Sequence, residues 1–269
     1  MSGASLDLAV VGNCAWAGLI DREARLVWAC LPRFDSDAIF PALLDDRPDH
    51  DGAFAIELLD LEACEQRYDG HTAILVSTLR DRHGGVLELR DFAPRFVNHG
   101  RFYRPTMLIR RVRPLRGEPR VRVVVRPRYG WGAQRPSVTR GSNHLRFVTP
   151  ELTLRLSSDA PISYLMGGVP FVVERPFDLI LGPDESLTAP IASTARDFDE
   201  RTRDYWTDWS RTLSIPFEWQ EEVIRAAIAL KLCHFEETGA IVAAHTTSIP
   251  EAPQSGRNWD YRYCWLRDA

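Results

Sequence analysis

The chain has 269 residues, of which 45% are hydrophobic and 26% charged, which is enough length and apolar content for a sizeable folded core. Its net charge is −4, from 33 basic and 37 acidic residues. That balance argues against a duplex nucleic-acid binder or a membrane-surface protein, because both need an excess of basic residues. No stretch of the sequence reaches the roughly 18 apolar residues of a membrane helix. We therefore expect neither a nucleic-acid nor a membrane partner.

The cysteines indicate the compartment and argue against a metal site. The five residues are scattered, and none forms a CxxC pair or a Cys/His set with zinc-ligand spacing: Cys14, Cys30, Cys64, Cys233 and Cys264. The first eleven residues lack the basic region and the apolar run of a signal peptide. We predict reduced thiols, no metal, no cofactor and a cytoplasmic location.

Residues 1–190 predict a mainly β domain. Short alternating segments recur every ten to fifteen residues or so, punctuated by turn pairs such as Gly84-Gly85 and Gly167-Gly168, which we interpret as hairpins. The expected strands are 26–30, 54–58, 74–79, 86–92, 107–112, 121–126, 145–148, 152–156, 171–174 and 179–181. No helical stretch separates them, so the pattern favours a large antiparallel β-sandwich. Arginines alternate with apolar residues on several strands, which predicts one solvated sheet face, while residues 123–125 predict a strand covered on both faces.

Residues 191–239 predict a linker of two helices. Ser193 or Thr194 can cap the first helix, whose apolar residues Phe198, Tyr205 and Trp209 share one face. Its expected solvent-facing ion pairs are Asp197–Arg201 and Asp199–Arg203.

The second expected helix follows Pro216 and is apolar nearly all round over residues 223–230. Gly239 is its expected stop. A helix of this kind needs protein on more than one side. We therefore expect either further helices after residue 269 or a partner chain to cover 223–230.

The segment 258–269 carries the chemistry. It interleaves four aromatic residues, Trp259, Tyr261, Tyr263 and Trp265, with Asp260, Arg262, Arg267 and Asp268. Aromatic rings match the C–H faces of sugars, and carboxylate with guanidinium matches their hydroxyls through charge-assisted hydrogen bonds. Composition alone leaves a second interpretation open, in which the aromatics are core and the charges satisfy one another.

Three motifs, in order along the chain, resemble family 15 of the glycoside hydrolases, whose members include bacterial glucoamylases, glucodextranases and one class of α,α-trehalases. They are residues 258–269, residues 11–13 followed by 28–36, and residues 238–251. The resemblance implies a β-sandwich, a helical linker and an (α/α)₆ catalytic barrel, of which residues 240–269 would be the incomplete start. The chain is thus expected to be the amino-terminal part of such an enzyme, cut off as the barrel begins.

The resemblance also implies site residues and a substrate class. Arg267 and Asp268 would bind the non-reducing terminal glucose, and Tyr261 and Trp265 would line its pocket. The family inverts the anomeric centre with a glutamate acid and a glutamate base that lie in later barrel segments, so no residue of this chain matches a catalytic role and the chain alone is expected to be inactive. The expected substrate is an α-linked glucose oligosaccharide, dextran or trehalose.

Three further features have two interpretations each. The loop that carries Arg33 and Asp35 either borders the sugar site or holds a buried ion pair that fixes a turn. His245, where the family more often has a small residue or proline, either perturbs the pocket or lies on a surface loop. Trp131 either stacks on a ligand or anchors a hairpin loop.

Two other functions compete with the hydrolase. One is a non-catalytic carbohydrate-binding or domain-docking β-sandwich module. The other is a protein-interaction subunit that docks a partner through helix 223–230.

Overall fold

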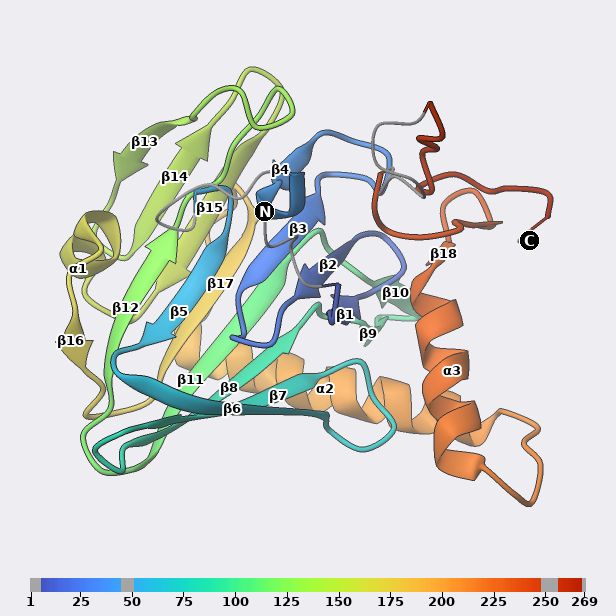
Figure 1. Cartoon of the computed structure of the whole chain (residues 1–269), viewed down its shortest axis with the longest axis horizontal. Coiled ribbons are helices and arrows are strands. Elements are labelled where there is room, and N and C mark those ends of the chain that lie inside the picture. Colours follow the sequence, from blue (N-terminus) through green and yellow to red (C-terminus); the bar gives the residue numbers. More distant parts are fainter. Residues whose placement is uncertain (1–5, 45–50, 248–255, 268–269) are drawn as a thin grey trace.

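The computed structural model describes residues 6–44, 51–247 and 256–267. It is 38% strand and 17% helix, with large antiparallel sheets followed by two helices (Figure 1). The predicted fold class, a mainly β antiparallel sandwich with two helices after it, is confirmed. No helix in these ranges is long and apolar enough to cross a membrane.

Two sheets form the sandwich. The seven-stranded sheet consists of β1 (Ala9–Gly12), β2 (Ala17–Ile20), β3 (Leu26–Cys30), β5 (Phe54–Leu58), β12 (Arg120–Val125) and β16 (Phe171–Val172) in that order, with β4 (Ala38–Phe40) paired to β3. The eight-stranded sheet has the order β13 (Ser137–Arg140), β14 (His144–Val148), β15 (Thr153–Ser158), β17 (Phe177–Pro183), β11 (Leu108–Arg116), β8 (Val86–Phe92), β7 (Leu75–Asp81) and β6 (Leu61–Tyr68).

The remaining elements lie around the sandwich. Two small hairpins are β9 (Phe96–Asn98) with β10 (Arg101–Tyr103) and β18 (His234–Phe235) with β19 (Ala240–Ile241). The helices are a 3₁₀ turn, Ala42–Leu44, followed by α1 (Ile162–Gly167), α2 (Ile191–Arg211) and α3 (Gln220–Leu232). In Figure 1, α2 lies along the eight-stranded sheet and α3 stands at the same end of the molecule as the carboxyl terminus.

Strand positions agree with the sequence pattern where alternation is clear. The bounds of β3, β5 and β8 match the expected strands 26–30, 54–58 and 86–92. The long strand β6 was not predicted, because it lies at the edge of its sheet and carries the polar residues that edges favour. The hairpin expected at Gly167-Gly168 is wrong: Gly168 adopts a left-handed conformation, φ 58°, and ends α1.

The helix α1 explains the valine run at residues 123–125. Val123 and Val124 are 1% and 6% exposed, and α1 packs against β12. The prediction that this strand is covered on both faces is confirmed.

The alternation predicted that the strand arginines lie on the solvated sheet face, but not all of them do. Arg110 of β11 points into the sandwich and forms a fully buried pair with Asp91, Nε to Oδ1 2.8 Å. It also donates to the backbone carbonyls of Phe54, at 2.7 Å, and Ala24 in the opposite sheet region. The two sheets are therefore joined by a guanidinium whose hydrogen-bonding capacity is used inside the core.

The face of the eight-stranded sheet under α2 carries buried charged side chains in addition to apolar ones. Asp199, expected on the solvated side of its helix, is buried and accepts bonds from Arg90 Nη2 at 3.0 Å and Arg111 Nη1 at 2.8 Å. Burial acts to raise the pKa of Asp199, but these two guanidiniums outweigh it and hold the pKa below its usual range. The expected partner, Arg203, pairs with Asp69 instead. This correction follows from the sheet arginines, which claim the carboxylate.

Helix α2 begins earlier than predicted. Pro190 precedes the first turn with φ −55° and ψ 143°, and no side chain caps the helix. The expected cap by Ser193 or Thr194 is therefore wrong; Ser193 Oγ bonds back to the Pro190 carbonyl at 2.8 Å. The expected pair Asp197–Arg201 is present, with a nitrogen–oxygen distance of 3.6 Å.

Helix α3 buries one face and exposes another. Ile224, Ile228 and Leu232 are buried, whereas Leu230 is 65% exposed, and Phe217 and Trp219 just before the helix are 99% and 71% exposed. The helix ends at Leu232, so the expected stop at Gly239 is wrong; Gly239, with φ 78°, lies in the turn between β18 and β19.

A polar junction fixes the sandwich to the chain after α3. Asn13 donates its side-chain amide to the carbonyls of Pro94 and Pro105 at 3.0 and 2.7 Å. Arg95, 1% exposed, donates to Asn13 O at 2.7 Å and to Glu236 Oε1 at 2.6 Å. Burial acts to raise the pKa of Glu236, but the hydrogen bonds from Arg95 and Lys231 outweigh it and lower the pKa. Through this junction the fold sets the position of the segment that follows.

Candidate functional site

The carboxyl-terminal segment 256–267 lies against the end of the sandwich that carries the β3–β4 loop (Figure 1). Its backbone pairs with the chain after β19: the Ala243 amide donates to Tyr263 O at 3.1 Å and the Ala244 amide to Tyr261 O at 2.8 Å. The segment thus lies next to the loop that the sequence analysis associated with a sugar site.

Arg262 holds this segment in place. Its side chain is 3% exposed and forms a bidentate pair with Asp260, with Nε–Oδ1 and Nη2–Oδ2 distances of 3.0 and 2.7 Å. Nη1 donates to the Ser36 carbonyl of the β3–β4 loop at 2.6 Å. Burial acts to raise the pKa of Asp260, but the bonds from Arg262 outweigh it and lower the pKa. These two charged residues are therefore used to position the backbone.

Trp131 completes the contact. The Arg262 guanidinium carbon lies 5.0 Å from the centre of the Trp131 ring, a cation–π distance. The Trp131 amide donates to Asp37 Oδ1 at 2.9 Å, which fixes the turn to the β3–β4 loop. Of the two interpretations of Trp131, the structure supports the anchoring one.

Three expected site residues come together. The rings of Tyr261 and Trp265 are tilted by 30° with centroids 6.1 Å apart, and both residues are half-buried. Trp265 Nε1 donates to Asp260 O at 3.0 Å, so the residue that pairs with Arg262 also fixes the indole. The Arg267 guanidinium lies 5.6 Å from the Trp265 ring centre and is exposed. Asp268, the fourth expected residue, lies outside the described residues.

Two other aromatic side chains of this segment keep faces that a ligand can reach. Trp259 and Tyr263 are 47% and 51% exposed, whereas Arg262 is buried. The interpretation of the aromatics as sandwich core is therefore wrong for these two residues, while Asp260 and Arg262 do satisfy one another's charge.

The Arg33–Asp35 pair is formed but not buried. Arg33 Nε donates to Asp35 Oδ1 at 3.0 Å, and the side chains are 45% and 34% exposed. The hydrogen bond from Arg33 holds the pKa of Asp35 below its usual range. Because the same loop accepts the bond from Arg262, the pair lies on the side of the sandwich occupied by the carboxyl-terminal segment.

His245 is enclosed, contrary to the surface-loop interpretation. Its ring packs edge-on against Phe34 with centroids 5.1 Å apart, and its Nδ1 is buried without a hydrogen-bond partner among the described residues. Its carbonyl accepts the indole N–H of Trp28 at 2.7 Å. Burial lowers the pKa of His245 to about 4, so the ring is neutral at pH 7.

The titratable groups of the described chain do not form a metal centre. No group of three or more His, Cys, Asp or Glu residues within these ranges is arranged to hold an ion. All five cysteines are free thiols, and burial raises the pKa values of Cys14, Cys30 and Cys64 to about 11. The prediction of reduced thiols agrees with this arrangement.

Comparison with known proteins identifies the family. The model for the trehalase-like N-terminal domain matches residues 6–175, more than half of the chain. The chain belongs to this trehalase-like family. A second model, glycosyl hydrolases family 15, matches residues 219–269, which include the carboxyl-terminal segment. The resemblance drawn from the sequence motifs is confirmed.

Curated relatives of this trehalase-like chain are trehalases. The trehalase of Thermoplasma volcanium is 30% identical over 96% of this chain and 42% of its own length. That of Thermoplasma acidophilum is 30% identical over 93% and 44%, and that of Mycolicibacterium smegmatis 29% identical over 98% and 43%. The chain thus spans less than half the length of these relatives. No solved structure matches it.

The residues expected to bind the sugar were named from the sequence, but the contacts that hold their segment in place were not predicted. The structural role of Arg262 and Trp131 depends on the Ser36 carbonyl, which is 226 residues away from Arg262. The one local indication was the Asp260-x-Arg262 spacing, which allows a carboxylate and a guanidinium to pair within one turn of the chain.

Proposed function

We propose that this chain is the amino-terminal portion of an inverting, exo-acting α-glucoside hydrolase, with trehalose as its substrate. The observation that carries the proposal is a segment matched by the family 15 model in which Tyr261, Trp265 and Arg267 stand together beside the sandwich of a trehalase-like family. The names of the relatives favour trehalose over dextran or starch ends. Two aromatic faces and a guanidinium suit a terminal glucose ring and its hydroxyls.

In this proposal the chain supplies one wall of the glucose subsite. Arg267, with Asp268, would bind hydroxyls of the non-reducing glucose, and Tyr261 and Trp265 would border its ring. The hydrogen bonds from Arg262 to Ser36 O and to Asp260 would keep this wall fixed to the sandwich. The glutamate acid and base would be supplied by chain that follows residue 269 in the parent enzyme.

The same parent chain would cover the exposed face of α3. Leu230, Phe217 and Trp219 present an apolar surface that water disfavours. Relatives more than twice as long as this chain have the additional residues that such a cover requires.

The proposal is tested by turnover. We expect the purified 269-residue chain to show no hydrolysis of trehalose, maltose or dextran, and the full-length protein that contains it to release glucose from trehalose. Proton NMR of the anomeric signals during the reaction should show equal initial amounts of β- and α-glucose, because the attacked glucose is inverted while the leaving glucose keeps its α configuration. Robust turnover by the 269-residue chain, or retention of configuration by the full-length protein, would contradict it.

The second candidate is a non-catalytic carbohydrate-binding module. The exposed rings of Trp259 and Tyr263 favour it, because exposed aromatics bind saccharides without catalysis. Sugar binding that survives deletion of residues 255–269 would support a module, whereas binding that is lost with this segment would favour the subsite.

A further inference from the structure

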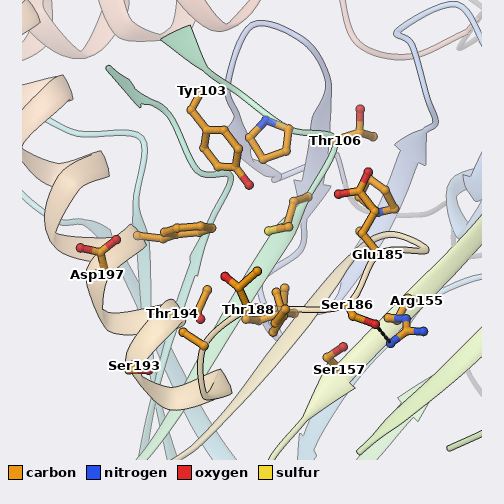
Figure 2. Close-up of a pocket in the computed structure, with 18 residues that line it drawn as sticks. Tyr103, Thr106, Arg155, Ser157, Glu185, Ser186, Thr188, Ser193, Thr194 and Asp197 are labelled. Atoms are coloured by element: carbon orange, nitrogen blue, oxygen red, sulfur yellow. Dashed lines mark hydrogen bonds between the residues drawn. The ribbon is translucent and has the colours of Figure 1, made fainter. Parts of the chain in front are cut away.

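A concave site lies away from the carboxyl-terminal segment. A cavity of 610 Å³ opens between the outer face of the eight-stranded sheet and the first turns of α2 (Figure 2). This volume lies within the roughly 300–1,000 Å³ of small-molecule sites. Its walls come from the chain around β10 and β11, from β15, from the loop after β17 and from α2, and no residue after 198 lines it.

The cavity contains a rigid apolar platform. The Phe198 ring is fixed from two sides, by Tyr103 at a centroid distance of 5.4 Å and by Phe96 at 5.2 Å. Met107 and Ile180 extend the apolar lining from the sheet. A fixed aromatic ring beside aliphatic side chains suits the C–H face of a pyranose.

Hydroxyl groups surround this platform. In Figure 2, Tyr103 points its hydroxyl toward the centre of the cavity, with Thr188 below it and Ser157 on the β15 side. Within the described ranges, none of these three hydroxyls has a protein hydrogen-bond partner. Ser157 and Thr194, whose residues are only 5% and 9% exposed, add two hydroxyls to the lining of the cavity. Hydroxyls both donate and accept, as sugar hydroxyls do.

The charges of the lining disfavour an anion. Arg155 donates its Nε to Asp184 at 3.1 Å, a carboxylate that it shares with Arg146, so its positive charge is partly compensated. Glu185 also lines the cavity, next to Ser186 in the loop after β17, and its negative charge adds to burial in raising the pKa of Tyr103. A phosphate or carboxylate would meet a carboxylate and hydroxyls here, whereas a neutral polyol can donate to both.

We propose that this cavity binds a neutral saccharide of one or two hexose rings, independently of the carboxyl-terminal segment. The inference goes beyond the proposed function, because it gives the sandwich a binding site of its own. A saccharide held here would keep the protein near glucan or disaccharide without contacting the residues proposed for the glucose subsite.

Calorimetric titration of the chain with trehalose and, separately, maltose tests this inference. Thr188→Trp fills the cavity from an exposed loop position, and we expect it to weaken saccharide binding by about tenfold or more. Thr188→Val keeps the side-chain shape, removes the hydroxyl and should weaken binding by about threefold. Thr139→Trp, at an exposed position on β13, is the matched control and should leave binding unchanged.

A second control separates this site from the proposed subsite. Trp265→Ala removes the indole of the carboxyl-terminal segment and should leave binding at the cavity intact. The inference is overturned if neither sugar binds, if Thr188→Trp leaves the affinity unchanged, or if Trp265→Ala abolishes binding. It is also overturned if ethanolamine, an organic cation, binds in a Thr188-dependent way and the sugars do not. Turnover by the full-length protein, which tests the proposed function, does not depend on any of these outcomes.

Discussion

Arg262 connects parts of the chain that are more than 200 residues apart. It pairs with Asp260 at 2.7 Å, donates to Ser36 O at 2.6 Å and lies over the Trp131 ring. A guanidinium can do this because its planar donors serve a carboxylate and a carbonyl at the same time. The position of the proposed glucose wall therefore depends on one side chain that does not itself face the ligand.

Removing this guanidinium should loosen the segment. We expect Arg262→Met to lower the free energy of unfolding by about 2 kcal/mol, because Asp260 and Ser36 O lose a partner in a half-enclosed site. Denaturant titration measures the loss. Arg211→Met, which breaks a pair whose side chains are 74% and 76% exposed, should cost less than about 0.5 kcal/mol. Equal losses in the two variants would mean that Arg262 does not hold the segment.

His245 should make stability depend on pH. Its pKa is about 4 in the folded protein against 6.5 for an ordinary histidine, so between these values the unfolded chain binds more protons. Stability therefore falls as the pH is lowered from 6.5 to 4, by about 3 kcal/mol in total. Unfolding free energies measured at pH 6.5 and 5 should differ less in His245→Gln than in the unsubstituted chain. His99→Gln, on an exposed turn, should keep the full difference; an unchanged difference in His245→Gln would contradict the assignment.

At the scale of elements, α2 is fixed to the sheet by a charged contact within an apolar one. Asp199 accepts hydrogen bonds from both Arg90 and Arg111, while Ile191 and Ala195 pack on the sheet isoleucines. Moving the helix away from the sheet would therefore separate Asp199 from the two arginines and leave buried charges without partners.

Asp199→Asn tests this attachment. We expect a loss of about 3 kcal/mol in unfolding free energy, because two buried guanidiniums would share a neutral amide. Asp197→Asn, two residues away on the exposed side with a pair distance of 3.6 Å, is the matched control and should change stability by less than about 0.5 kcal/mol. A small loss at Asp199 would show that the apolar contacts alone hold α2.

Strand positions could be predicted from the sequence, but the contacts of α2 with the sheet could not. Alternation is a local property, so β5 and β8 were predicted with their observed bounds. The burial of Asp199 was not predictable, because its spacing to Arg203 suggests a solvent-facing pair and its true partners lie 109 and 88 residues away. In the candidate site, the resemblance to family 15 singled out Tyr261, Trp265 and Arg267, whereas the contact of Arg262 with Ser36 O forms only when the β3–β4 loop is brought alongside.

At the scale of the whole molecule, the sandwich carries an exposed segment at one place and a cavity at another. One is the carboxyl-terminal segment beside the β3–β4 loop, and the other is the hydroxyl-lined cavity next to α2 (Figures 1 and 2). Helix α3, which precedes the segment in the chain, lies beside the sandwich with Leu230 65% exposed on its free face. The arrangement suits a domain that presents a binding wall to further protein, as expected for a chain that covers 42% of its relative from Thermoplasma volcanium.

The most direct test of this account is the effect of Arg267→Lys on trehalose hydrolysis by the full-length protein. Lysine keeps the charge but loses the paired donors of the guanidinium, so we predict that kcat/KM falls about 100-fold while the unfolding midpoint is unchanged, since Arg267 is exposed in this chain. An unaltered kcat/KM for trehalose would contradict the claim that the carboxyl-terminal segment forms one wall of the glucose subsite.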